Sequence, residues 1–200
     1  MPRAGLTPAA VVAAGADLAD EVGHADATLV QLAERVGVRT PSLYKHIAGQ
    51  ADLNRRIAAL AMDEAADAIG TAIQGLSGRD ALAAAARALR DFVVSHPGRY
   101  AATTGVRATG PQDPVAVAAA RALGPFSAVL RGYDIPPEEM THALRALRSV
   151  FHGFSTLEAG GGFQYSTDVD DSFEWLIALV DQGLRGMTAP EGTSPTSTAP

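Results

Sequence analysis

The sequence contains no cysteine, and this absence excludes several kinds of chemistry at once. Without thiols the chain has no disulfides, no thiolate metal ligands and no cysteine nucleophile, which fits a reducing compartment. No stretch reaches the roughly 18 uninterrupted apolar residues of a membrane span. The N-terminus also lacks a basic segment followed by an apolar run. We therefore expect a soluble, cytoplasmic protein that does not associate with membranes.

Several motifs of enzymes and metal sites are missing as well. Five histidines occur, at positions 24, 46, 96, 142 and 152, and none forms a His-x-x-x-His pair. A P-loop, a dinucleotide fingerprint and a Gly-x-Ser-x-Gly elbow are absent. The triplet at 160–162 is Gly-Gly-Gly without a following Gly-Lys, which indicates a flexible connection. We expect no metal, no cofactor and no enzymatic activity.

Lysine is nearly absent, since Lys45 is the only one among 200 residues and every other cation is arginine. The net charge of −6 argues at face value against a nucleic-acid partner. The charge of the docking face matters more than the average, however. Between Arg35 and Gln50 the ionised side chains are Arg35, Arg39 and Lys45, with no acid. Such a run fits either a docking face or an ordinary solvated surface.

The remaining composition favours helices throughout. Alanine and leucine are abundant, alternating β-branched residues are missing, and glycine and proline recur at helical intervals. The pattern predicts an all-α fold with helices at about 7–22, 29–36, 40–47, 50–73, 79–95, 99–107, 114–130 (with a bend at 124–125), from 138 onward, and 169–184. The last twelve residues are small, polar and proline-rich, which predicts disorder over 189–200.

The second and third predicted helices form a helix-turn-helix. Thr28 is a plausible N-cap, and Gly37 stops the helix in the left-handed turn that such a unit needs. The next helix starts at Thr40-Pro41 and presents its N-terminal half, which can enter the major groove of DNA. The residues that we expect to be exposed there are Arg39, Thr40, Ser42, Lys45 and His46. Two helices joined by a glycine turn also occur as plain packing units.

The residue identities in this segment are a more specific indication of DNA binding than the helix-turn-helix pattern alone. Residues 28–53, TLVQLAERVGVRTPSLYKHIAGQADL, closely resemble the DNA-binding signature of TetR-family bacterial regulators. The resemblance implies a helix-turn-helix DNA-binding domain over 1–49 and a helical effector-binding and dimerisation domain over 50–188. It implies phosphate contacts from Thr28, Tyr44 and His46, and base contacts from Thr40, Pro41, Ser42 and Lys45. Otherwise Tyr44 is a core aromatic and His46 a helix C-terminal cation.

Two positions depart from the family pattern. Ile47 stands where the family usually has an aromatic residue, and it preserves the packing. Gln50 stands where lysine is common, which removes one phosphate-binding cation.

A looser resemblance extends along the rest of the chain. The stretches HPGRY (96–100) and SVFHGFSTLEAGGGF (149–163) are similar to a subgroup named for a Trp-His-Gly motif, with Phe151-His152-Gly153 in its place. His152 fits either a core histidine or a polar group in an apolar ligand cavity. The candidates for that cavity are Phe92, His96, Tyr100, Phe126, Phe151 and His152. Because the surroundings are mostly apolar, we expect a small, largely hydrophobic effector.

The last two helices carry apolar stripes that fit either an intramolecular core or a subunit interface. The stripe residues are Met140, Leu144, Leu147, Phe173, Ile177 and Val180. The family resemblance favours an interface, in which two copies pair through a four-helix contact. We therefore expect a homodimeric repressor that binds a palindromic double-stranded DNA operator and is released by a small-molecule effector. The alternative is a helical binding or scaffold protein that keeps the fold but reads no DNA.

Overall fold

The computed structural model describes residues 6–188, and within this range the chain forms helices and no strands. The helices are α1 (Pro8–Val22), α2 (Leu29–Arg35), α3 (Thr40–Leu43), α4 (Gln50–Ala72), α5 (Gly78–Ser95), α6 (Pro97–Ala101), α7 (Pro114–Arg131), α8 (Met140–Ala159) and α9 (Val169–Thr188). The all-α expectation is confirmed. The predicted disordered tail lies outside the described residues.

Side-chain and glycine caps fix the ends of the first two helices. The Thr7 hydroxyl accepts a hydrogen bond from the Ala10 amide at 3.1 Å, and Pro8 follows in the first turn of α1. Thr28 and Gln31 form a reciprocal capping box at the start of α2. At the end of α2, Gly37 has a φ of 70°, which favours glycine because the residue lacks a β carbon.

Two helices are shorter than the sequence predicts. The third was expected over 40–47, but α3 ends at Leu43 and the chain continues through turns to Gly49. Leu43 and Ile47 are nonetheless both buried, because a turn that ends in a bond from the Ile47 amide to the Leu43 carbonyl keeps them on one face. The helix expected over 99–107 is α6, which ends at Ala101. Its last turn closes with bonds from Thr103 and Thr104 to carbonyls three residues earlier.

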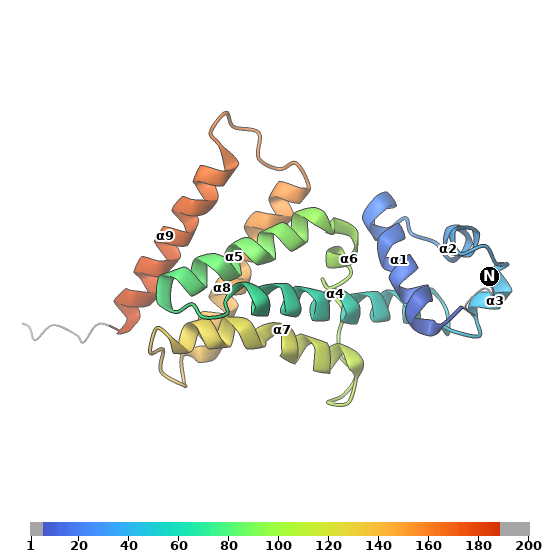
Figure 1. Cartoon of the computed structure of the whole chain (residues 1–200), viewed down its shortest axis with the longest axis horizontal. Helices are drawn as coiled ribbons and strands as arrows, with labels where there is room; N and C mark the ends of the chain where they lie inside the picture. Colours follow the sequence, from blue (N-terminus) through green and yellow to red (C-terminus); the bar gives the residue numbers. More distant parts are fainter. Residues whose placement is uncertain (1–5, 189–200) are drawn as a thin grey trace, which may run out of the picture.

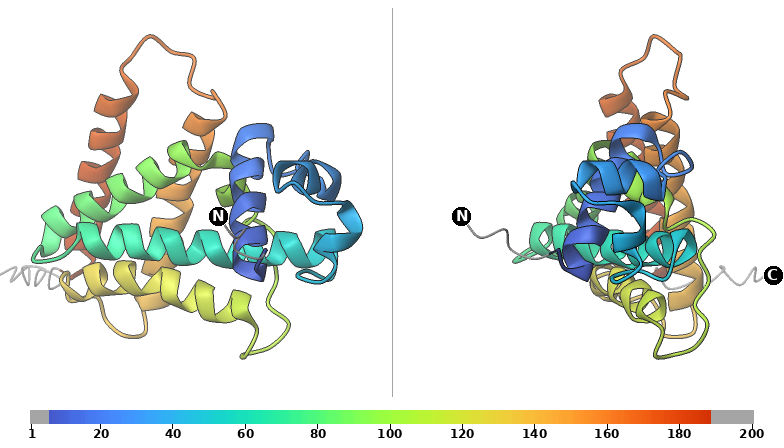
Figure 2. Two further views of the ribbon diagram at one scale, coloured as in Figure 1. Left: turned by 45° about the vertical axis from the view of Figure 1, so that its right-hand side comes forward. Right: turned by 90° about the vertical axis from the view of Figure 1, so that its right-hand side faces the viewer.

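The long helix α4 runs through the whole molecule and connects its two ends (Figure 1). At one end it packs against α1, near α2 and α3; at the other it lies between α5 and α7. Figure 2 (left) shows α8 crossing behind α5 and α4 toward α7, with which it also packs, and α9 at the end away from α1–α3. None of the helices within residues 6–188 combines the length and the apolar character that crossing a bilayer requires.

Two apolar cores follow this arrangement. The smaller one joins α1, α2 and α3 to the first turns of α4, with Leu32, Leu43 and Ile57 almost fully buried. The larger one joins α5, α7, α8 and α9 around Phe151 and Phe173, whose rings are 6.1 Å apart. The proposed division at residues 49 and 50 therefore cuts just before a helix that contributes to both cores. The division remains a prediction.

Arg90 of α5 holds the last two helices together. Its guanidinium binds Glu158 of α8 and Asp170 of α9, each at 2.6 Å, and lies 4.9 Å from the centre of the Phe173 ring. A cation over an aromatic face adds to the ion pairs in fixing both helices. The Gly-rich segment between α8 and α9 thus connects two helices that Arg90 already holds in place.

The short helix α6 lies between α1 and α4 and connects the two ends of the molecule (Figure 1). Its Arg99 is buried, with a side chain 9% exposed, and pairs with three carboxylates. Two of them, Asp17 and Asp20, belong to α1, and the third, Glu64, belongs to α4. A buried cation with several charged partners anchors α1 against the C-terminal helices.

Candidate DNA-contacting surface and ligand cavity

The helix-turn-helix forms one end of the molecule. The turn between α2 and α3 is fixed by amide-to-carbonyl bonds from Gly37 to Glu34 (3.1 Å) and from Val38 to Ala33 (3.0 Å). This pattern is a Schellman motif, which satisfies the last carbonyls of a helix. Val38 packs against the smaller core, so the turn is anchored and α3 is held at a fixed angle. The start of α3 points outward as a result.

The predicted DNA-binding residues lie together around this end. Thr28, Arg39, Pro41, Tyr44 and Lys45 are exposed, and Thr40, Ser42 and His46 are half-buried. Tyr44 is 57% exposed, so it is a surface aromatic and not a core residue. Leu43 and Ile47 point the other way into the core. Hydroxyls, a phenol and cations on one exposed surface match the groups that contact phosphates and base edges.

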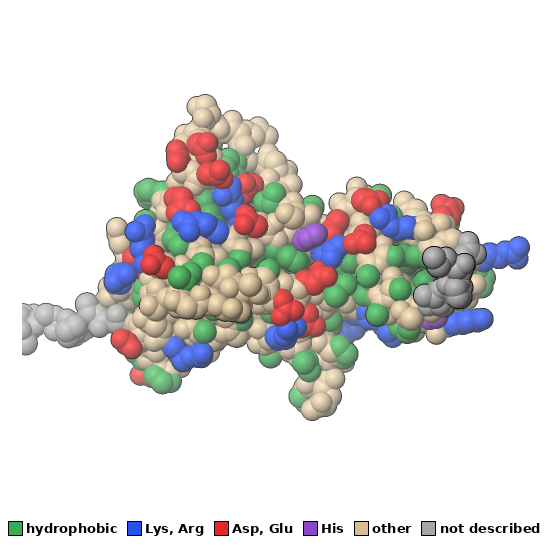
Figure 3. All heavy atoms as spheres, in the orientation of Figure 1, with side chains coloured by type: hydrophobic (Ala, Val, Ile, Leu, Met, Phe, Trp, Pro, Cys, Tyr) green, Lys and Arg blue, Asp and Glu red, His purple; other side chains and the backbone are tan. Residues whose placement is uncertain are grey.

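The cations near this end differ in whether an acid already pairs with them. Arg35 forms a two-bond ion pair with Glu21, with both contacts at 2.6 Å. The cations in the early turns of α4 are also paired, Arg55 with Asp113 and Arg56 with Asp52. In the part of the chain that the structure describes, neither Arg39 nor Lys45 forms an ion pair, so their charges are available to an external anion. Figure 3 shows basic side chains protruding at this end of the molecule.

Gln50 has a different role from the one that its sequence position suggested. Its side-chain amide donates to the Ala27 carbonyl at 3.0 Å and to the Asn54 side chain at 2.8 Å. The amide thus ties the start of α4 to the segment before α2.

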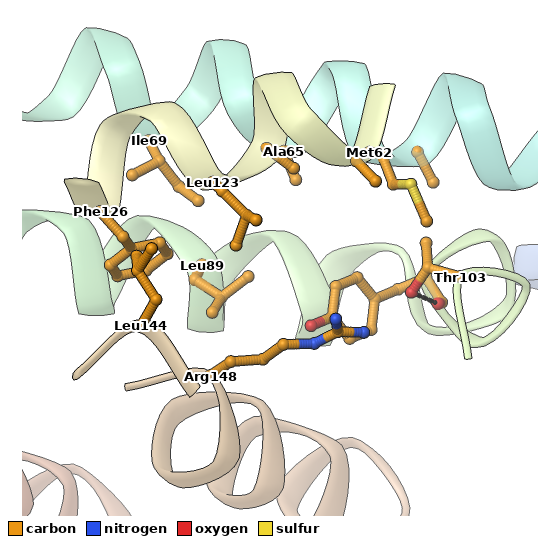
Figure 4. A pocket seen from close by; sticks show the side chains of 13 residues that line it. Met62, Ala65, Ile69, Leu89, Thr103, Leu123, Phe126, Leu144 and Arg148 are labelled. Carbon is orange, nitrogen blue, oxygen red and sulfur yellow. Dashed lines mark hydrogen bonds between the residues drawn. The ribbon is translucent and has the colours of Figure 1, made fainter. Parts of the chain in front are cut away.

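A cavity of about 130 Å³ lies in the C-terminal part, between α4, α5, α6, α7 and α8. It is lined by Ala61, Met62, Ala65, Ile69, Leu89, Tyr100, Thr103, Ala119, Ala122, Leu123, Phe126, Leu144 and Arg148. Figure 4 shows Met62, Ala65 and Ile69 of α4 on one side and the extended side chain of Arg148 along another edge. The cavity is open on one side and mostly apolar, as small-molecule sites usually are.

Of the six residues predicted for a ligand cavity, two line it: Tyr100 and Phe126. Phe151 lies behind Phe126, with ring centres 6.4 Å apart, and is fully buried. Phe92 packs beside Tyr100 with ring centres at 6.3 Å. These two phenylalanines support the wall without lining the cavity.

The two histidines occupy different places. His152 does not line the cavity, but its Nδ1 lies 3.0 Å from the Tyr100 hydroxyl, so it orients a residue that does. His96 lies outside the cavity: its Nδ1 is 3.2 Å from Asp20 of α1 and its side chain is 40% exposed. His96 thus does not line this cavity, and its assignment to the ligand site stays a prediction. It sits at the α1–α6 contact, because residue 96 precedes α6 on the side of the N-terminal helices.

Burial keeps the two groups beside the cavity uncharged, and for His152 a neighbouring cation adds to this effect. Burial raises the pKa of the Tyr100 phenol. Burial and the nearby Arg148 guanidinium both lower the pKa of His152. At neutral pH the pair is a phenol bonded to a neutral imidazole, and Arg148 is the only ionised group that lines the cavity.

Three lining residues with a heteroatom in the side chain were not predicted from the sequence: Met62, Thr103 and Arg148. Leu144, expected at a subunit interface, also lines the cavity. The spacing of Leu144, Arg148 and Phe151–His152 places these residues on one face of α8, and this periodicity was the available signal. Arg148 was overlooked because arginine in an amphipathic helix normally marks the solvent face.

The stripe predicted as a dimer interface lies mostly inside the chain. Leu147, Phe173 and Ile177 are at most 3% exposed and belong to the larger core. They are therefore unavailable to a second copy, and this expectation is corrected. Met140, Leu144 and Val180 are half-buried against the same core. The exposed apolar side chains of α8 and α9 are instead Leu157 (55%), Trp175 (67%), Leu179 (49%) and Met187 (54%).

Comparison with known proteins gives consistent results for sequence and fold. Residues 82–180 match the family described as Tetracyclin repressor-like, C-terminal domain. The chain is 30% identical over 187 residues to the uncharacterized HTH-type transcriptional regulator YobS of Bacillus subtilis (strain 168), covering 92% of this chain and 95% of that protein. It is 31% identical over 192 residues to the uncharacterized HTH-type transcriptional regulator Rv0681 of Mycobacterium tuberculosis, covering 96% and 87%.

Solved structures share the fold at lower identity. A crystal structure of BioQ with its double-stranded DNA operator aligns with a TM-score of 0.66 at 22% identity, covering 90% of this chain and 99% of that one. A TetR variant from Acinetobacter baumannii AYE in complex with minocycline aligns with a TM-score of 0.70 at 23% identity, covering 93% and 100%.

Proposed function

The chain belongs to the TetR family of transcriptional regulators, and from this we propose that it is a homodimeric repressor released from its operator by a small organic effector. One observation carries the proposal: α6 contributes both to the wall of the cavity and to the contact with α1. Tyr100 lines the cavity, while Arg99, the preceding residue, pairs with Asp17 and Asp20 of the helix-turn-helix unit. A ligand that moves Tyr100 thus acts directly on the DNA-binding end.

In this proposal, release of the operator follows from the contact between α6 and α1 and from the long helix α4. Both α4 and α6 line the cavity and both contact α1, so occupation of the cavity shifts the angle of the DNA-binding unit. In a dimer the two recognition helices must sit about 34 Å apart, one turn of DNA, to bind two half-sites. A coupling of about 1–3 kcal/mol between the two sites lowers operator affinity about 5- to 150-fold.

The dimer that we propose uses the outward faces of α8 and α9. Trp175 and Leu179 are one helical turn apart on α9, and Leu157 is exposed on α8. Large exposed apolar side chains on two neighbouring helices indicate a partner surface. This keeps the predicted four-helix contact but assigns it to different residues from the buried stripe.

We also retain the assignment to the Trp-His-Gly subgroup as a proposal. It is supported by Phe151-His152-Gly153, in which His152 binds the Tyr100 hydroxyl and Phe151 supports Phe126. These contacts give the tripeptide a structural role beside the cavity, which is consistent with membership of the subgroup.

The proposal is tested by a mobility-shift assay on the DNA that flanks the protein's own gene, at fixed salt. We expect a discrete complex with the wild-type protein and a weaker one with Lys45→Ala. Arg35→Ala is the matched control, because Arg35 already pairs with Glu21. Absence of any specific complex, with all DNA bound equally weakly, would support the alternative of a helical scaffold protein, which the net charge of −6 favours.

A further inference from the structure

The cavity has a size and a charge that together restrict the effector, on the premise of the function proposed above. Its volume of about 130 Å³ is close to the roughly 150 Å³ of an engineered apolar cavity that binds benzene. A single ring or a chain of about five to eight carbon atoms therefore fills it. A large polycyclic molecule would need the surrounding helices to move apart.

The walls of the cavity are apolar except at one edge. Of the lining side chains only Tyr100, Thr103 and Arg148 carry polar atoms. The alanine, leucine and isoleucine side chains of α4, α5 and α7 form the remaining wall, together with Met62, Phe126 and, on α8, Leu144. A ligand is thus expected to have an apolar body and one polar end.

Arg148 determines which charge the polar end of the ligand carries. Several other arginines of the C-terminal helices are already paired with acids: Arg87 with Glu174, Arg90 with Glu158 and Arg121 with Asp63. Over residues 6–188 no carboxylate forms an ion pair with Arg148. Its guanidinium extends along the cavity edge toward Thr103 (Figure 4). An unpaired planar donor beside an apolar cavity matches the two oxygens of a carboxylate.

The neighbouring polar groups complement a carboxylate and do not cancel the charge of Arg148. The Thr103 hydroxyl donates to the Tyr100 carbonyl at 2.7 Å, so its hydrogen is already used. The Tyr100 hydroxyl lies 3.0 Å from His152 Nδ1. In the tautomer whose Nδ1 carries the proton, His152 donates to Tyr100 and the phenol is free to donate to a ligand oxygen. No lining residue is an acid, so nothing compensates a cationic ligand.

We propose that the effector is a small monocarboxylic acid, with one ring or a short alkyl chain, whose carboxylate binds Arg148 and whose body lies among α4, α5 and α7. A second negative charge on the ligand would find no second cation among the lining residues. A neutral ligand fills the apolar part but leaves the charge of Arg148 without a counter-charge. The monoanion is the class that uses every group present.

The test is a binding comparison on the full chain in the absence of DNA. Benzoate, benzamide and benzylamine share one ring and differ in charge, and hexanoate, hexanamide and hexylamine repeat the series with a chain. We expect the wild-type protein to bind one or both acids at least about tenfold more tightly than the corresponding amide. We expect it to bind neither amine. Arg148→Gln should lower acid affinity about tenfold and change amide affinity less than about twofold. Arg145→Gln is the matched control, because Arg145 is also exposed on α8 but does not line the cavity.

The proposal is overturned if both amides bind as tightly as their acids, if an amine binds most tightly, or if neither acid binds. It is also overturned if Arg148→Gln and Arg145→Gln have the same effect on the acids. Because binding is measured without DNA, these outcomes are independent of the repressor function. An acid that binds through Arg148 and leaves operator affinity unchanged contradicts release by the effector and supports the ligand class.

Discussion

Gly98 of α6 lies directly against the backbone of Ala19 of α1. A β carbon placed at Gly98 would be 1.8 Å from the Ala19 carbonyl oxygen, far inside van der Waals contact. Both residues are buried, and the neighbouring Arg99 secures the same contact through its carboxylate partners. The DNA-binding unit and the cavity wall therefore meet backbone to backbone, with no flexible side chain between them.

This close approach predicts that Gly98→Ala disturbs the contact between α1 and α6. Because the obstructing atom belongs to the backbone, one of the two helices has to shift, at a cost of about 1–3 kcal/mol or more. Urea unfolding measures the loss. Gly70→Ala in α4 is the control, since its nearest atom, Pro125 Cγ, is at 3.9 Å, and it should be neutral or slightly stabilising. Equal stability of the two variants would show that α1 and α6 move freely.

Arg99→Gln tests the ionic part of the same contact. Removing a buried cation leaves the Asp20 carboxylate with only the backbone amide of residue 99 and His96 Nδ1 as partners, and we expect a loss of about 3 kcal/mol in unfolding free energy. That figure is at the low end for buried pairs because Asp17 and Glu64 are partly exposed. Arg121→Gln, which removes an exposed cation from Asp63 and Asp67, should leave stability unchanged. A similar loss in both variants contradicts a special role for Arg99.

Lys45→Ala should cost about 1–3 kcal/mol of binding free energy on the specific operator if the amine contacts a base. Tyr44→Phe should weaken all DNA sequences alike, because a phosphate contact carries no sequence information. Fluorescence anisotropy with operator and scrambled duplexes at fixed salt separates the two effects. Unchanged operator affinity in Lys45→Ala would remove this residue from the readout.

Trp175→Glu combined with Leu179→Glu should convert the proposed dimer to a monomer. Two carboxylates in an apolar interface are desolvated without partners, which opposes association. Light scattering at micromolar concentration measures the mass. Val117→Glu changes an equally exposed apolar side chain (57%) on α7 and should leave the dimer intact. A wild-type protein that is already monomeric would contradict the proposed assembly.

The stability of the chain should fall as the pH drops below neutral, and His152 should contribute to this fall. Its pKa is lowered in the folded state by burial and by Arg148, so the unfolded chain binds a proton first. Stability is therefore complete above the unfolded value of about 6.5 and is lost as the pH falls from there toward the folded pKa. Urea unfolding at pH 5.5 and 7.5 should show a smaller difference for His152→Gln than for wild type. Some difference remains, because burial also lowers the pKa of His24.

The helix-turn-helix could be predicted from the sequence because its ends are determined locally. Thr28 caps α2 through its own hydroxyl, and Gly37 supplies a backbone angle that other residues disfavour. The length of α3 could not be predicted. The i, i+4 spacing of Leu43 and Ile47 is satisfied both by a helix and by the observed turn.

The residues of the interface and of the cavity could not be predicted in the same way. Their roles depend on which element covers an apolar stripe, and the periodicity of the stripe does not specify this. Phe173 and Ile177 form a regular stripe whether α5 or a second copy covers it, and in the structure the chain's own core does. Arg148 presents the same ambiguity. Its spacing of four residues from Leu144 is compatible both with a position at the cavity edge and with a position facing solvent. Only the position of α4 and α7 relative to α8 decides between them.

The scarcity of lysine has a practical consequence for labelling. Lys45 is the only side-chain amine of the chain, and it is exposed beside α3. An amine-selective acylating reagent therefore has a single side-chain target, which lies on the surface assigned to DNA. Its rate of modification reports occupancy of that surface without any engineered label, and operator DNA should slow the reaction in proportion to binding. An effector that releases the operator should restore the rate, so one chemical footprint follows both halves of the proposed regulatory cycle.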